Sequence, residues 1–346
     1  MNAGPTECAD ASADEHLAGS AGEQSIGGEN PRLTDSNHSA SSHRSPSLNA
    51  MGNADASAPV LVASVIIPAY QAAKTIGEQL AALVAQDFPD TWEIVVVDDG
   101  STAETRSIPA SFAVAFPSLR VISNGGNHGV NHARNRGVSE AAGELLLFCD
   151  ADDVVAPGWV AALVDALRSG DAAGGAIDLE ALNPPRLLLQ TRPALGQTSF
   201  LLRGSRLPSA FGCCFAVRRS VWARVGGFDE RIHWGGCDEV DFFWRLQLAG
   251  HGLVSAPDAL VARRLRPTLR KLAWQELTYG YAATQLLRGY GRSDPEPLAS
   301  SVASRVFRRR SISTIAAELG WLAGCLVGRI WPDTRWAPLA VPAVEG

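Results

Sequence analysis

Short apolar runs alternate with helix-length amphipathic stretches along the chain beyond residue 60. The first run, Val62–Ile67, is rich in β-branched residues and ends at Pro68, as is typical of a buried strand. A helix is predicted over Ala72–Ala85 and a second strand over Glu93–Val97. Strands and helices that alternate in this way predict an α/β fold, with a mostly parallel sheet flanked by helices.

The alternation continues through the middle of the chain. Strands are predicted over Leu119–Ile122 and Glu144–Phe148, and a loop with several glycines leads into the helix between them, which runs through Glu140. Pro157 is placed in the first turn of a helix that runs through Leu167, because a proline there loses no helical hydrogen bond.

The second half of the chain predicts fewer strands and longer helices. Gly212–Val217 is predicted as a strand and Ser220–Val225 as a short helix that ends in a glycine turn. A helix over Cys237–Leu248 closes at Gly250, and another spans Leu269–Leu287. The face of the first of these two helices that we expect to be buried comprises Val240, Phe243, Trp244, Gln247 and Leu248.

Residues 1–58 differ in composition from the rest of the chain. They contain no aromatic residue and no valine, and consist mostly of Ala, Ser, Gly, Asn and acidic residues. Such a segment buries too little apolar surface to offset the entropy lost on ordering, so we expect a disordered tail. It also lacks the basic start and apolar run of a secretory signal. We expect a main domain over 59–266 and a basic, amphipathic helical extension over 267–346.

Charge is also distributed unevenly. Residues 1–58 carry a net charge of −6, as does the whole chain, whereas residues 259–310 hold eleven Lys and Arg against three acids. A basic strip of this kind is typical of a surface that meets phosphates or an anionic membrane, and equally of a solvated helix. The apolar segment Ile312–Ile330 contains Glu318 and Arg329, which favours a packed or interfacial helix over a membrane span.

The six cysteines form no CxxC pair and have no metal-site spacing. Without a secretory signal they are expected to be reduced thiols, several of them buried. We therefore expect a cytoplasmic protein, with a peripheral contact to the inner face of a membrane as the option that the basic strip leaves open. No nucleic-acid partner is expected.

Polar or acidic residues follow three of the predicted strands. They are Pro68-Ala69-Tyr70, Asp98-Asp99 and Asp150-Ala151-Asp152. The carboxyl ends of parallel strands lie at one edge of a sheet, and ligands bind beyond that edge in open α/β folds. A random acidic turn has no reason to recur there, so this placement predicts a binding site.

Asp150 and Asp152 are suited to bind a divalent cation. Residues i and i+2 at a strand end point to the same side, and hard cations take oxygen ligands. Acidic pairs with this spacing also arise by chance as solvated turns, but this pair directly follows an apolar strand. A cation held here would meet the negative charge of a leaving diphosphate.

Three further residues could bind a nucleotide. Asp98 and Asp99 offer acceptors for a base N–H or a ribose hydroxyl, and the alternative is a simple acidic turn. Arg134, in the helix after the glycine-containing loop, could clamp a phosphate or a ribose, and the alternative is a surface arginine.

Asp238 and Glu239 open a predicted helix directly after Gly235 and Gly236. Carboxylates are favoured at a helix N-terminus, where they cap it. The two glycines leave room for a ligand to approach the backbone, so a carboxylate here could also accept a hydroxyl proton as a general base. The two roles do not exclude each other.

Several segments resemble those of inverting family 2 glycosyltransferases, which have the Rossmann-like GT-A fold. In chain order they are Ser64–Tyr70, Ile94–Ser101 (IVVVDDGS), Ala133–Gly137, Gly143–Phe148 with the DAD triplet, Gly212–Glu230, Asp238–Asp241 and Trp244–Leu246. The resemblance covers about residues 62–266, and the segments follow the order and spacing of the family. No single motif is decisive, but their joint occurrence is specific.

The resemblance implies a donor and metal site in a GT-A catalytic domain over 59–266. The nucleotide's base and ribose would be held by Pro68, Tyr70, Asp98 and Asp99. By the same resemblance, Arg134 would contact the ribose or diphosphate, and Asp150 the ribose and metal. Asp152 would be the direct ligand of Mn²⁺ or Mg²⁺.

The resemblance also implies a catalytic base at Asp238 or Glu239 and a single displacement with inversion. The family usually has Glu followed by Asp at this site, whereas this chain has Asp followed by Glu. Glu239 occupies the usual position of the base, one methylene longer, so we favour Glu239 with Asp238 as a contributor. The Gln-x-x-Arg-Trp signature of processive synthases is missing.

We therefore expect transfer of one sugar to a glycan, lipid-linked or small-molecule acceptor in cell-envelope or polysaccharide biosynthesis. One alternative is a sugar nucleotidyltransferase, which would carry a glycine-rich loop with Lys or Arg where this chain has Pro68-Ala69-Tyr70-Gln71. The other is a non-catalytic lipid- or polymer-binding protein that acts through its basic C-terminal region.

Overall fold

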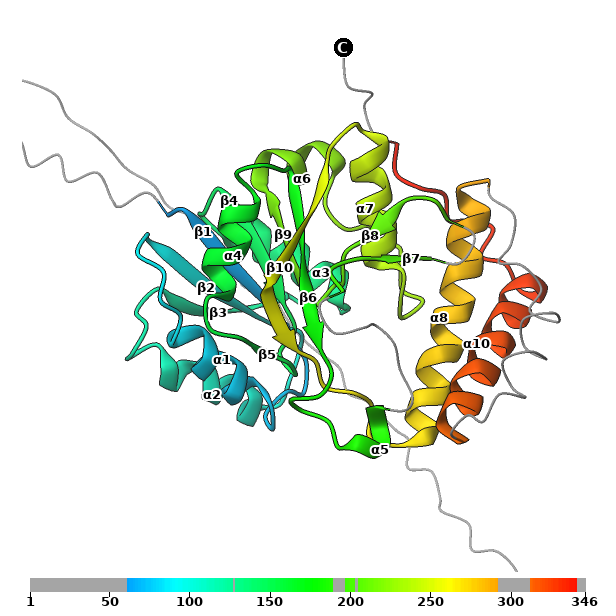
Figure 1. The fold of residues 1–346 in the computed structure, drawn as a ribbon, viewed down its shortest axis with the longest axis horizontal. Coiled ribbons are helices and arrows are strands. Elements are labelled where there is room, and N and C mark those ends of the chain that lie inside the picture. Colours follow the sequence, from blue (N-terminus) through cyan, green and yellow to red (C-terminus); the bar gives the residue numbers. More distant parts are fainter. Residues whose placement is uncertain (1–60, 127, 189–196, 203–204, 292–311, 341–346) are drawn as a thin grey trace, which may run out of the picture. The chain divides into compact units, whose positions relative to one another are not determined.

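The computed structural model describes residues 61–126, 128–188, 197–202, 205–291 and 312–340. The predicted disordered tail lies outside these ranges, as does the arginine-rich end of the basic strip. Within them, a mixed β-sheet carries helices on both faces (Figure 1).

An eight-stranded sheet forms the centre of the fold. Its strands, in spatial order, are β3 (Leu119–Ser123), β2 (Trp92–Asp98), β1 (Ala63–Ala69), β4 (Leu145–Cys149), β9 (Cys214–Arg218), β6 (Ala172–Asp178), β10 (Leu253–Ala262) and β5 (Val154–Val155). The strands β3, β2, β1 and β4 are parallel neighbours, whereas β9 is antiparallel to both β4 and β6. The predicted α/β class and mostly parallel sheet are confirmed.

Three shorter elements lie outside this sheet. They are the paired strands β7 (Phe200–Leu201) and β8 (Pro208–Ser209), and the one-turn helix α5 (Pro185–Leu188).

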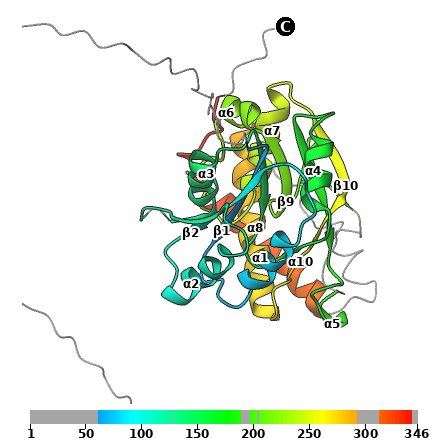
Figure 2. The ribbon, with the colours of Figure 1, turned by 90° about the vertical axis from the view of Figure 1, so that its left-hand side faces the viewer.

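Alternating side chains of the central strands build a core on each face of the sheet. In β1, Val65 and Ile67 join one buried cluster and Ile66 joins the other. The first face is covered by α1 (Ile76–Val84), α2 (Ala103–Phe112) and α4 (Trp159–Ala166), and the second by α3 (Val130–Glu140), α6 (Arg219–Val225) and α7 (Asp238–Leu248). Figure 2 shows α3 and α4 on opposite sides of the strands.

Two helices begin later than predicted. Helix α1 starts at Ile76 because the chain first makes a turn after Gln71, whose φ is 51°. Helix α4 starts at Trp159, because Gly158 has a left-handed φ of 78° that helical geometry does not allow. The placement of Pro157 in the first turn of α4 is therefore wrong, since the proline precedes the helix.

The predicted buried face of α7 is wrong at its C-terminal end. Leu248 is 56% exposed, and Gln247 is only partly buried. The residues that α7 buries are Asp238, Val240, Asp241, Phe242, Phe243, Trp244, Arg245 and Leu246. Helix α7 buries two faces because it lies between the sheet and α8 (Leu269–Gly289), a neighbour that helical periodicity alone does not show.

Helix α8 forms a close pair with α10 (Ile312–Ile330). Glycines permit the two backbones to touch: a Cβ at Gly280 would collide with the carbonyl oxygen of Trp321, and one at Gly324 with that of Leu277. The pair continues the fold beside α7, where Leu286 and Leu287 join a buried cluster with Trp244. None of the helices in the described residues combines the length and low polarity that a membrane crossing requires.

A buried ion pair fixes α7 to the turn that follows α6. Arg245 and Asp241 are both fully buried and lie 2.7 Å apart. Arg245 also donates hydrogen bonds to the backbone oxygens of Val225 and Gly227. Its charge and its donors are therefore fully matched inside the protein.

We predict that Arg245→Ala lowers the free energy of unfolding by about 3–5 kcal/mol, because it leaves the Asp241 carboxylate buried without its partner. Urea denaturation would measure the change. The matched control is Arg136→Ala, which removes an exposed i,i+4 pair with Glu140 and should cost less than about 1 kcal/mol. Equal costs for the two variants would contradict the prediction.

Candidate active site

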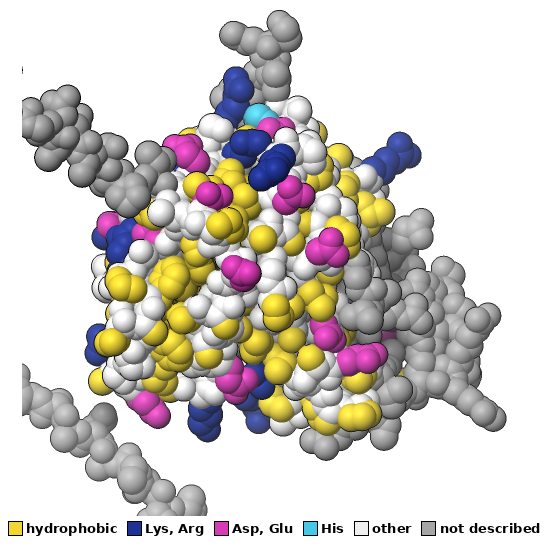
Figure 3. All heavy atoms as spheres, turned by 60° about the vertical axis from the view of Figure 1, so that its left-hand side comes forward, with side chains coloured by type: hydrophobic (Ala, Val, Ile, Leu, Met, Phe, Trp, Pro, Cys, Tyr) yellow, Lys and Arg dark blue, Asp and Glu magenta, His cyan; other side chains and the backbone are white. Residues whose placement is uncertain are grey.

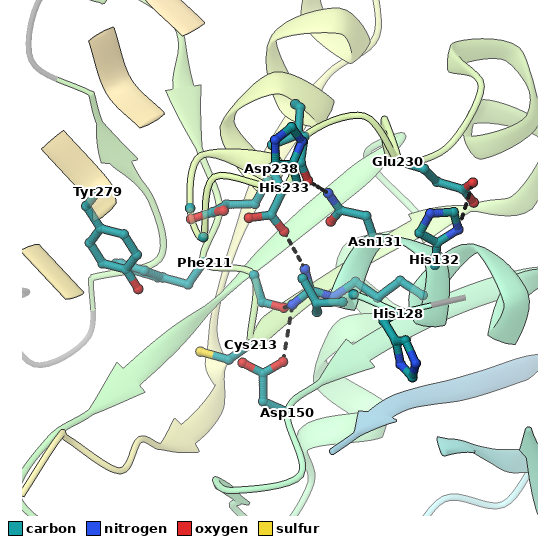
Figure 4. Close-up of a pocket in the computed structure, with 18 of the residues that line it drawn as sticks. His128, Asn131, His132, Asp150, Phe211, Cys213, Glu230, His233, Asp238 and Tyr279 are labelled. Carbon is teal, nitrogen blue, oxygen red and sulfur yellow. Dashed lines mark hydrogen bonds and ion pairs between the residues drawn. The ribbon is translucent and has the colours of Figure 1, made fainter. Parts of the chain in front are cut away.

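A cavity of about 540 Å³ lies beyond the carboxyl end of β4 (Figure 4). Its walls come from segments far apart in the sequence: the start of α3, the residues before β9, the residues before α7, the end of β10 and α8. Side chains that line it include His128, Asn131, His132, Arg134, Asp150, Phe211, Cys213, Glu230, Ile232, His233, Asp238, Glu239, Arg263 and Tyr279.

Arg134 connects the two acidic sides of this cavity. Its Nη1 donates to Asp238 at 2.8 Å and its Nη2 to Asp150 at 3.2 Å. Nη2 also donates to the backbone oxygen of Gly212, and the guanidinium lies 5.0 Å from the centre of the Phe228 ring. Burial alone would lower the pKa of Arg134, but the surrounding carboxylates outweigh it and raise the pKa above its usual value.

Asp238 and Glu239 reach the cavity from the first turn of α7. The chain turns sharply before them, with positive φ at Gly235 and Cys237. The ring of Tyr279 occupies the space that a Cβ at Gly236 would need. These glycines therefore let α8 approach the loop and set the direction in which the two carboxylates point.

The environments of Asp238 and Glu239 differ. Asp238 forms an ion pair with Arg134, with 2.8 Å between its carboxylate and Nη1. Burial, and next the negative charge of Asp238, raise the pKa of Glu239 to about 8. A carboxylate with a pKa near neutral pH has the property required of a general base.

At the other side of the cavity, Asp150, Asp153 and Cys213 each place a potential ligand atom within 4.8 Å of the others. Burial, followed by the charges of Asp150 and Asp152, raises the pKa of Asp153 to about 8. Crowded, buried carboxylates of this kind are stabilised by a cation. The carboxylates present therefore fit a hard divalent ion.

Asp152, the predicted metal ligand, is not among the residues that line the cavity. Its side chain is 43% exposed and lies 3.8 Å from Nη1 of Arg266. Its neighbour Asp153 is buried and accepts a hydrogen bond from the backbone N–H of Arg264. The structure thus brings Asp150 to the cavity and leaves Asp152 at the same strand end, turned toward the segment after β10.

The predicted nucleotide-binding residues lie at the ends of the neighbouring strands β1 and β2. Asp99 accepts hydrogen bonds from Asn124 and from the backbone N–H of Gly129, so it supports the loop that begins one wall of the cavity. Asp98 accepts a hydrogen bond from the backbone N–H of Ser101 and lies 4.0 Å from Arg106. Both carboxylates are buried.

Pro68 is the penultimate residue of β1, and Tyr70 directly follows that strand. Tyr70 is 64% exposed, so its ring is accessible. Because β2, β1 and β4 are adjacent and parallel, the three predicted polar clusters do share one edge of the sheet. Only Asp150 among them lines the cavity itself.

Several cavity residues were not predicted as site residues from the sequence. Arg263 and Tyr279 come from β10's end and from α8, where the sequence indicated only a basic strip and an amphipathic helix. Cys213 stood within a predicted strand. The arginines directly after β10 were the one available signal, because basic residues at a strand end often meet phosphates.

Comparisons with known proteins agree with this architecture. Residues 64–226 match the family model described as Glycosyl transferase family 2. The mannosyltransferase PcManGT from Pyrobaculum calidifontis, solved in complex with GDP-Man and Mn²⁺, superposes with a TM-score of 0.52 at 21% identity, covering 80% of this chain and 77% of that one. This similarity supports the GT-A fold.

Two relatives show the extent of the sequence similarity. Glycosyltransferase AglE of Haloferax volcanii is 28% identical over 211 residues, which are 59% of this chain and 67% of AglE. The pre-mycofactocin glycosyltransferase of Mycobacterium tuberculosis is 32% identical over 200 residues, which are 56% of this chain but only 42% of that protein. The predicted resemblance is confirmed over residues 64–226, which match glycosyl transferase family 2, and the α/β fold of the chain agrees with that of a solved GT-A mannosyltransferase.

Proposed function

We propose that this enzyme transfers one sugar from a nucleoside-diphosphate sugar to a hydroxyl group with inversion at the anomeric carbon. The observation that carries the proposal is the cavity in which Asp238 and Glu239 face Asp150, with Arg134 between them. A single displacement needs the acceptor's base and the leaving group on opposite sides of the sugar. The cavity offers a carboxylate on each side.

The donor's base and ribose are assigned to the edge formed by Pro68, Tyr70, Asp98 and Asp99. The accessible ring of Tyr70 can stack on a nucleotide base. Asp98 and Asp99 lie where the neighbouring strand ends, and Asp99 accepts a hydrogen bond from Gly129 in the cavity wall. Asp150 would then meet the ribose, with Arg134, which is hydrogen-bonded to Asp150, beside it.

A divalent cation is assigned to Asp152 with Asp150, next to the cluster in which Asp150, Asp153 and Cys213 bring potential ligand atoms together. When bound, Mn²⁺ or Mg²⁺ supplies positive charge to the leaving diphosphate. Asp152 is the exposed carboxylate at this strand end, so it can exchange its contact with Arg266 for a ligand. PcManGT, which shares the fold, was solved with GDP-Man and Mn²⁺.

Glu239 is assigned as the general base and Asp238 as its positioning partner. The acceptor oxygen attacks the anomeric carbon while the bond from that carbon to the diphosphate breaks. The Glu239 carboxylate takes the acceptor proton, and the electron pair of the broken bond leaves with the diphosphate. Asp238, held by Arg134, cannot move toward the acceptor without breaking its ion pair.

We assign the acceptor to the lipid-linked class because α10 presents an aligned apolar face. Leu319, Leu326 and Ile330 recur at helical spacing and are each more than half exposed, and Trp331 follows them. Elsewhere, as in Figure 3, exposed apolar side chains are interspersed with charges of both signs, which is usual for a protein surface. A continuous apolar face at a helix surface suits contact with a membrane.

The two other functions considered from the sequence have less support. A sugar nucleotidyltransferase would belong to a different family, and the non-catalytic alternative does not account for a cavity with opposed carboxylates. Cell-envelope or polysaccharide biosynthesis remains the proposed context.

We predict that kcat/KM rises with pH and levels off above about 8, because Glu239 must lose its proton before it can accept one. Below that pH the protonated form dominates and activity falls. Glu239→Gln should lower kcat by about 10²–10⁴-fold and abolish the rise, with donor affinity nearly unchanged. The control is Glu104→Gln at the exposed start of α2. A pH rise retained in Glu239→Gln would assign it to another group.

We predict that Asp152→Ala abolishes metal-dependent turnover and weakens Mn²⁺ binding measured by calorimetry, while the melting temperature stays nearly unchanged because the side chain is 43% exposed. Asp153→Asn is the comparison, since it alters the buried carboxylate of the same strand end. Full turnover of Asp152→Ala at saturating Mn²⁺ would show that Asp152 is not the ligand.

We predict that Leu326→Glu weakens binding to vesicles of phosphatidylcholine and phosphatidylglycerol by about tenfold or more, because it places a charge in the apolar face of α10. Vesicle sedimentation would measure this. Leu248→Glu is the matched control, as that leucine is 56% exposed, against 57% for Leu326, but lies on α7. Equal losses for the two variants, or no loss for Leu326→Glu, would refute a membrane contact through α10.

A further inference from the structure

Arg263 is a cation in the cavity wall that the proposed reaction does not yet use. It directly follows β10 and lines the cavity together with Asp150, Cys213 and Tyr279. Within the part of the chain that the structure describes, its guanidinium makes no hydrogen bond or ion pair. An arginine carries five N–H donors and a permanent charge, so one that faces a cavity in this state is suited to bind an anion.

The other arginine of the cavity cannot take this role without a rearrangement. Both terminal nitrogens of Arg134 are used, one by Asp238 and the other by Asp150 and the Gly212 oxygen. Arg134 therefore neutralises the protein's own carboxylates. Between the two arginines that line the cavity, Arg263 has its donors available for a ligand.

Hydrogen bonds fix the backbone on both sides of Arg263. Its N–H donates to the oxygen of Asp178 at 2.8 Å, and its carbonyl oxygen accepts from the side chain of Asn183. The next residue, Arg264, donates its backbone N–H to Asp153 and its Nε to the oxygen of Asp152. The segment is thereby attached to the strand end that carries the acidic residues.

The position of Arg263 also fits the path of the reaction. Arg263 lines the same cavity as Asp150 and Glu239, and its charge interacts with those of Asp150 and Asp153. Arg263 thus shares the cavity with both the donor end and the proposed base. In a nucleoside-diphosphate sugar, the outer phosphate is the group bonded to the transferred sugar.

We propose that Arg263 binds the outer phosphate of the nucleoside-diphosphate donor and stabilises it as the leaving group. This inference rests on the proposed function. As the bond between the anomeric carbon and the phosphate oxygen breaks, its electron pair passes to that oxygen. The Arg263 guanidinium donates hydrogen bonds to the charged phosphate without giving up a proton. Arg263 thereby supplies positive charge to the leaving group in addition to that of the divalent cation.

The test is nucleotide binding by the full chain in the presence of Mn²⁺. Calorimetry with UDP, GDP and dTDP identifies the nucleoside diphosphate that the wild type binds, and the matching monophosphate is then compared. Arg263→Ala should weaken binding of the diphosphate by about 10- to 100-fold and change binding of the monophosphate by less than about twofold. Arg263→Lys, which keeps the charge but loses the planar fork, should recover part of the loss.

The matched control is Arg270→Ala, which removes the same charge from the exposed first turn of α8. Melting temperatures close to that of the wild type would confirm that the variants fold. Turnover adds a second readout, because Arg263→Ala should lower kcat as well as donor affinity if the contact strengthens as the leaving group gains charge.

The possible failures can be told apart. If the wild type binds none of the three diphosphates with Mn²⁺, the proposed function itself fails. If the wild type binds a diphosphate and Arg263→Ala binds it equally well, only the role of Arg263 is overturned. Equal weakening of the diphosphate and the monophosphate would also overturn it, because the contact would then not be to the outer phosphate.

Discussion

The buried bridge from Asp238 through Arg134 to Asp150 is the interaction on which the arrangement of this site depends. It joins helix α3 to the end of β4, 16 residues away in the chain, and to the first turn of α7, 104 residues away. The guanidinium is almost fully buried, so its charge is tolerated only while both carboxylates remain beside it. The same contact therefore holds the cavity together and sets its electrostatics.

That electrostatic arrangement divides the work between two adjacent carboxylates. Asp238 is paired with Arg134, whereas burial, and next the negative charge of Asp238, raise the pKa of Glu239. Two acids that are neighbours in sequence thus lie in different surroundings. A similar separation occurs at the end of β4, where Asp152 is exposed beside Arg266 and Asp153 is buried.

Most of the sheet could be predicted because its signals are local. The β-branched run of β1 and the apolar runs of β2 and β4 bury every second side chain on each face, and this periodicity is written in the sequence. Helix boundaries were less predictable. Gly158 and Gln71 adopt left-handed backbone conformations that delay α4 and α1, and Leu248 is exposed because α8, which only the folded chain brings to α7, covers a different face.

The sequence by itself determined the α/β class, the family resemblance of residues 64–226 and the presence of acidic residues at one sheet edge, because these follow from local periodicity and from motifs in a fixed order. Only the tertiary structure decided which of those residues face one another. It placed Asp150 in the cavity and Asp152 beside Arg266, and it brought Arg263 from the end of β10 and Tyr279 from α8 into the same wall. Contacts between segments this distant in the chain depend on packing, which has no local signature in the sequence.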